Sequence, residues 1–210
     1  MAGKAQLGVS APLVDNADLP RLRTTLDKAK WFTPLERRVP VGKPTKDLLR
    51  IPTRDAQKLL ADVVRLVADL PRDTTPVLVW QQGASELEVD TAATSIVCAE
   101  GLVTLTVTVG CDQLDKPAEL VVPFAVGTAE APTGLVMSTF TKPDGPAIIT
   151  GLWSDAITAF AWESLVELAR RTCAQFGRDT QSRALIPGGI AAAEGVLLIQ
   201  PMSRTAAMRG

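Results

Sequence analysis

The hydrophobic period of this chain changes once, around Pro71, and that change limits the possible folds more than any other feature. Between Thr53 and Pro71, apolar residues recur at the three-and-four spacing of a single helix face. They are Leu59, Leu60, Val63, Val64, Val67 and Leu70. Thr53 is a suitable N-cap, and proline cannot continue the helix. The sequence therefore predicts a helix that packs one face against a core.

After Pro76 the period becomes two. Residues 85–90 alternate acidic with apolar side chains, and residues 102–109 alternate threonine with valine or leucine. Both patterns are typical of strands with one buried and one solvated face. Further candidate strands are residues 77–82, 94–99, 119–126 and 134–140. These segments predict an antiparallel β-meander of five or six strands, with Pro123 at an edge or a bulge because proline donates no ladder hydrogen bond.

A longer helix is predicted from Ser154 to Phe176, with Gly177 as its terminator. Its apolar face should cover the buried side of the meander. Trp162 within it and Trp153 just before it are interpreted as packing residues. A turn at Pro187-Gly188-Gly189 and a short strand over residues 196–200 follow. The predicted fold class is α+β, a meander packed against two helices.

The first fifty-two residues read as an extended arm. Prolines recur along them and bias each preceding residue toward extended geometry, which leaves room only for a short helix over residues 22–31. These prolines are Pro12, Pro20, Pro34, Pro40, Pro44 and Pro52. The aromatic pair Trp31 and Phe32 needs a surface to cover. We thus expect an arm (1–52), an α+β core (53–200) and a polar tail (201–210).

Charge is distributed unevenly along the chain, although the formal net charge is −1. Residues 21–58 contain eleven basic and four acidic residues, a local charge of +7, whereas residues 59–151 contain four basic and twelve acidic residues, a local charge of −8. Such a division favours docking between oppositely charged segments. The alternative is an ordinary solvated surface.

The chain contains no histidine. The usual general base and the commonest zinc ligand are therefore absent, and no cofactor or metal is expected. Cys98, Cys111 and Cys173 are odd in number and widely spaced, which fits a reducing compartment. Cys98 and Cys173 fall on apolar faces and are expected to behave as small hydrophobic residues.

Glu86, Glu88 and Asp90 project from one strand face, with successive members about 7 Å apart. A straight strand cannot bring such carboxylates together around a metal ion, so the row is either a docking stripe for a basic segment or a solvated face. The acidic stretch from Cys111 to Asp115 lacks the glycine and closing glutamate of a calcium loop and predicts a turn.

Two other short motifs carry no chemistry. Residues 42–45 lack the leading glycine and the preceding strand of a phosphate-binding loop. Residues 139–142 pair threonine with lysine but offer no oxyanion hole, and they predict a strand end.

These observations predict a structural or assembly subunit of a larger complex of the phage, virus-like or secretion type, and not an enzyme. Its docking residues are Trp31, Phe32, Arg37, Arg38, Lys43, Lys46, Glu86, Glu88 and Asp90. The expected partners are further copies of the chain or other proteins, with at most weak binding of nucleic acid and none of membranes. The expected location is the cytoplasm of the producing or host cell, or an assembled particle. A peptide-binding or chaperone-like module and a small carboxylate-dependent enzyme are the alternatives.

Overall fold

The computed structural model describes residues 47–71, 74–133, 142–176 and 184–203. Within these ranges the elements are β1 (Leu49–Pro52), α3 (Thr53–Val67), β2 (Val77–Gln82), β3 (Ser85–Ala99), β4 (Leu102–Gly110), β5 (Ala118–Ala125), α4 (Ala147–Phe176), β6 (Leu185–Ala193) and β7 (Val196–Ser203). The strands form two antiparallel sheets, one with the order β2-β3-β4-β5 and one with the order β1-β7-β6. The predicted α+β class is confirmed. None of the helices described here is both long and apolar enough to cross a bilayer.

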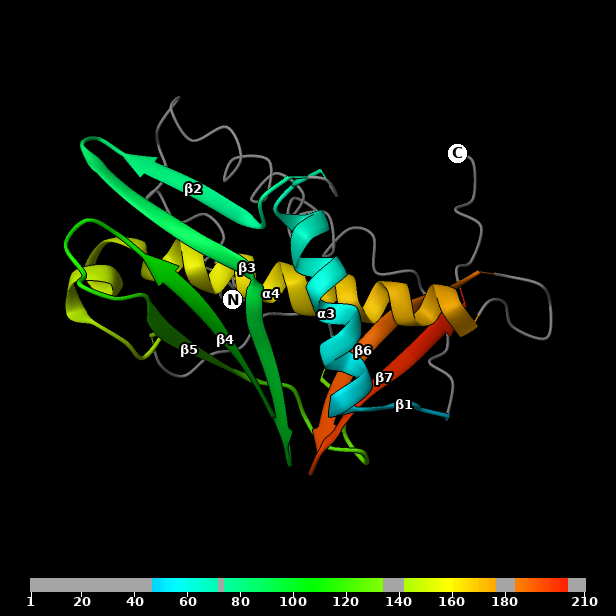
Figure 1. Cartoon of the computed structure of the whole chain (residues 1–210). Helices are drawn as coiled ribbons and strands as arrows, with labels where there is room; N and C mark the ends of the chain where they lie inside the picture. The colour runs from blue at the N-terminus through cyan, green and yellow to red at the C-terminus, as the bar shows by residue number, and fades with distance from the viewer. Residues whose placement is uncertain (1–46, 72–73, 134–141, 177–183, 204–210) are drawn as a thin grey trace, which may run out of the picture.

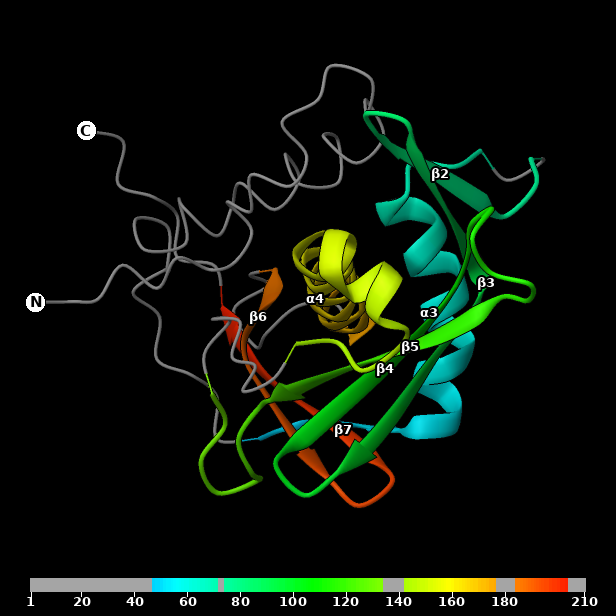
Figure 2. The same ribbon diagram turned by 90° about the vertical axis from the view of Figure 1, so that its left-hand side faces the viewer.

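The two sheets diverge from a common end, with α3 in the opening between them and α4 running across both (Figure 1). Figure 2 shows α4 nearly end-on above the strands. At the common end, backbone hydrogen bonds join the sheets directly. The amide of Gly101 donates to the carbonyl of Ala192 at 3.0 Å, the amide of Ala192 to Gly127 at 3.1 Å, and the amide of Gly195 to Cys98 at 3.0 Å.

The core lies between α4 and the inner faces of both sheets. Alternate residues of β2 to β5 are buried there, as the period of two predicts, except at Gln82 and where Ala92 and Ala93 of β3 are both exposed. Aromatic rings fill the centre: Trp80 meets Phe160 edge-on at 5.6 Å, and Phe124 lies 5.2 Å from Trp162. Trp153 lies 6.2 Å from Trp80, so both predicted tryptophans of α4 are packing residues.

The first helix begins at the predicted residue but not with the predicted cap. Thr53 is the first residue of α3, Pro52 occupies the N-cap position, and no side chain caps the helix. The backbone amide of Thr53 donates instead to the carbonyl of Gly195 at 2.8 Å. The N-cap prediction was therefore wrong: Pro52 takes that position, and its side chain has no hydrogen-bond acceptor.

The second helix is longer and more completely buried than the sequence predicts. It begins at Ala147, seven residues before Ser154, and is buried on all sides between Ala156 and Val166. Its two ends emerge from the core, where Ile148 and Phe176 are exposed. A helix enclosed in this way has no single apolar stripe, and a stripe search therefore misplaces its start.

Two strand regions also extend beyond their sequence-based limits. β1 lies within the span assigned to the arm and pairs with β7, and β7 continues to Ser203. Pro123 lies in β5, an edge strand of the four-stranded sheet, as predicted. The candidate strand at residues 134–140 and the candidate helix at residues 22–31 lie outside the described residues.

Candidate docking surface

The acidic row of β3 lies on the outer face of the four-stranded sheet. Glu86 and Glu88 are exposed, while Leu87 and Val89 between them are fully buried. The sheet face was thus predicted correctly from the alternation of residues 85–90.

Cross-strand neighbours position the two glutamates. Glu88 lies opposite Val79 of β2 and Gly110 of β4. A Cβ atom on Gly110 would lie 3.8 Å from Oε2 of Glu88, so this carboxylate extends over the glycine. Glu86 lies opposite Gln81, and Nε2 of Gln81 donates to its Oε1. Neither glutamate forms an ion pair within the described part of the chain.

Asp90 has a structural role that the sequence did not indicate. Its Oδ1 accepts hydrogen bonds from the backbone amides of Ala92 at 2.9 Å and Ala93 at 3.2 Å. These bonds hold the irregularity at which β3 loses its register with β4, between Asp90 and Ser95. One of its carboxylate oxygens is therefore engaged by the strand itself.

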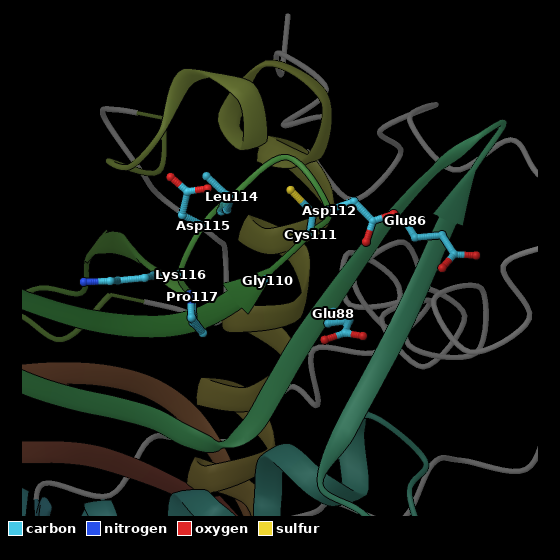
Figure 3. Close-up of a pocket in the computed structure, with 9 residues that line it drawn as sticks. All are labelled: Glu86, Glu88, Gly110, Cys111, Asp112, Leu114, Asp115, Lys116 and Pro117. Atoms are coloured by element: carbon cyan, nitrogen blue, oxygen red, sulfur yellow. The ribbon is translucent and has the colours of Figure 1, made fainter.

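The loop between β4 and β5 adds two more carboxylates to this end of the sheet. A hollow of about 240 Å³ is lined by Glu86, Glu88, Gly110, Cys111, Asp112, Leu114, Asp115, Lys116 and Pro117. Figure 3 shows that Asp112 lies beside Glu86, whereas Lys116 extends away from both glutamates. The loop contains the predicted turn, in which the amide of Leu114 donates a hydrogen bond to the carbonyl of Cys111 at 3.0 Å. Sequence reasoning identified this turn but did not bring it next to the acidic row.

The hollow is lined by negatively charged side chains, but these are not arranged to bind a metal ion. In the ranges that the structure describes, no group of three or more Cys, Asp or Glu side chains could hold a metal ion. The site can therefore attract cationic groups by long-range electrostatics and by hydrogen bonds to exposed carboxylates.

The thiols outside the hollow are buried. Burial raises the pKa of Cys173 to about 12, and burial also raises the pKa of Cys98, against a smaller opposing effect of the Thr53 side chain. A raised pKa disfavours the thiolate, which is the nucleophilic form. Both residues behave as packing residues, as predicted.

The remaining predicted docking residues, Trp31, Phe32, Arg37, Arg38, Lys43 and Lys46, lie outside the described residues. In comparisons with known proteins, no family model, curated protein or solved structure matches the chain.

Proposed function

We propose that this chain is a non-catalytic assembly subunit that docks through its basic N-terminal arm onto the acidic end of the four-stranded sheet of a neighbouring subunit. The observation that carries the proposal is the gathering of Glu86, Glu88, Asp112 and Asp115 at one end of that sheet. The cytoplasm of the producing or host cell, followed by incorporation into a particle, is part of the same proposal.

Charge complementarity supports the arm as the occupant. Residues 21–46 contain eight basic and two acidic residues, and the hollow contains four carboxylates and one lysine. Exposed ion pairs contribute only about 0–1 kcal/mol each, so a docking surface of this kind acts through several charges together. It also increases the association rate at low ionic strength.

We expect the double substitution Glu86→Gln and Glu88→Gln to weaken self-association about 5- to 30-fold and to reduce its dependence on salt. Sedimentation equilibrium at about 50 and about 200 mM salt measures both effects. The matched control is Glu100→Gln with Glu194→Gln, which removes two exposed carboxylates from turns at the other end of the molecule. Equal affinities for both double variants at low salt would contradict the proposal.

A peptide-binding module is the second candidate, and the open edge of β2 favours it. The native mass separates the two functions. A discrete oligomer supports the assembly subunit, whereas a monomer at all concentrations that binds extended peptides supports the module.

A further inference from the structure

The open edge of β2 is the least protected backbone in the described part of the chain. The edge of β5 is bridged by Asp144, which pairs with Val121, and the edge of β6 is bridged by Thr133, which pairs with Ile190. β1 is only four residues long. β2 has six residues and contains neither proline nor a charged side chain, and among the described strands it pairs with β3 alone. Proteins normally protect such an edge, so an unprotected one indicates a strand-forming partner.

One hydrogen bond determines which backbone groups of β2 face outward. The amide of Thr91 donates to the carbonyl of Pro76 at 2.8 Å, so residue 76 bonds toward β3. Bonding direction alternates along a strand. Val77, Val79 and Gln81 therefore direct their N–H and C=O groups away from β3.

These three residues also lie on the acidic face. They are cross-strand neighbours of Asp90, Glu88 and Glu86, respectively. By the same alternation these are non-hydrogen-bonded pairs, in which side chains approach most closely. A strand added to this edge would place the side chains of its pairing residues on the face that carries the glutamates.

The sequence of the arm is compatible with such a strand along one edge only. The positions of Pro34, Pro40 and Pro44 differ by even numbers, six and four. In an extended chain, their missing N–H groups all fall on one edge, because backbone direction alternates with a period of two. The opposite edge keeps every N–H group, and the residues on it are Leu35, Arg37, Val39, Val41 and Lys43.

We infer that β2 accepts residues 35–43 of a neighbouring copy as an added antiparallel strand, through the backbone of Val77, Val79 and Gln81. This inference rests on the proposed function and specifies its contact. Only the proline-free edge of the segment can pair, and pairing through it directs Arg37 and Lys43 to the acidic face. The register that sets Val39 opposite Val79 sets Arg37 opposite Gln81, the cross-strand neighbour of Glu86.

Two neighbouring proline substitutions in the full-length chain test the inference. Val41→Pro removes an N–H from the pairing edge, and we expect it to weaken self-association about tenfold, the effect of one lost backbone hydrogen bond. Gly42→Pro removes an N–H from the outer edge, and we expect an affinity within about twofold of the unmodified chain. Sedimentation equilibrium measures both affinities, and thermal melting checks that each variant folds.

Amide hydrogen exchange provides a second readout. We expect the amides of Val79 and Gln81 to become protected as the full-length chain associates, and to be less protected in Val41→Pro at a concentration near the dissociation constant of the unmodified chain. Equal association by the two proline variants, or no protection of these amides on association, would overturn the inference.

Further variants distinguish a failure of the added-strand inference from a failure of the proposed function. If changing Arg37, Arg38, Lys43 and Lys46 to alanine weakens association while the two proline variants behave alike, arm docking stands and the added strand fails. If the alanine variant associates as well as the unmodified chain, the proposed function itself fails. A monomer at every concentration excludes a second copy as the occupant and overturns the inference.

Discussion

Gln57 joins α3 to β3 at the irregularity in the strand. Its Nε2 donates to the carbonyl of Thr94 at 2.9 Å, and its Oε1 accepts from the amide of Ile96 at 2.9 Å. β2 pairs with β3 only as far as Asp90, so beyond it a side-chain amide supplies two bonds that a neighbouring strand would otherwise provide. The acidic row ends at Asp90, where this irregularity begins.

We expect Gln57→Met to lower the free energy of unfolding by about 1–3 kcal/mol, because it keeps the size of the side chain and leaves two backbone groups unpaired. Urea denaturation followed by circular dichroism measures the change. Lys58→Met is the control on the next residue. It removes an ion pair with Asp55 whose side chains are 63% and 54% exposed, so its effect should stay within about 1 kcal/mol. Equal effects of the two substitutions would show that the Gln57 bonds contribute nothing.

At the scale of elements, the sequence predicts strands whose pairing is regular and misses strands whose pairing is irregular. Residues 77–82 were predicted with the observed bounds, and residues 102–109 to within one residue. The candidates at residues 85–90 and 94–99 are one strand, because Asp90 and Gln57 carry the chain through the irregularity. No local pattern contains the long-range contact with Gln57.

The predicted turn at Pro187-Gly188-Gly189 lies inside β6 for a similar reason. The register of β6 with β7 shifts between Pro187 and Gly189. A Cβ atom on Gly188 would overlap the side chain of Met202, and one on Gly189 would lie 2.7 Å from the carbonyl oxygen of Thr133. The glycines are required by close packing, whereas the sequence pattern is equally typical of a turn.

Gly127 belongs to the junction between the sheets, where its carbonyl accepts from Ala192. Its φ is +73°, and a Cβ atom there would overlap the carbonyl oxygen of Ala131. We expect Gly127→Ala to lower the free energy of unfolding by about 3 kcal/mol or more, because strain and overlap add. Gly83 has a φ of +60°, and no atom lies within 4 Å of its Cβ position. Gly83→Ala should therefore lower the free energy of unfolding by only about 1–2 kcal/mol. Chemical denaturation of both variants tests this order, and a reversed order would contradict it.

At the scale of the whole molecule, the candidate site could be predicted only in part. The acidic row and its exposed face follow from alternation within one strand. Its association with Asp112 and Asp115 depends on where the β4–β5 loop lies relative to β3, which sequence spacing does not contain. The open edge of β2 likewise depends on the order of strands in the finished sheet.

The boundary between arm and core can be tested by two truncations. β1 pairs with β7 over four residues, and Ile51 is buried with 6% exposure, so the core begins before the predicted residue 53. We expect a chain starting at Asp47 to keep a cooperative melting transition. A chain starting at Thr53 loses the burial of Ile51 and the backbone bonds of β1, and its free energy of unfolding should be lower by at least about 3 kcal/mol. Calorimetry should then show a melting temperature lower by about 6–12 °C than that of the longer truncation. A non-cooperative transition in the chain that starts at Asp47 would instead show that residues 1–46 form part of the core.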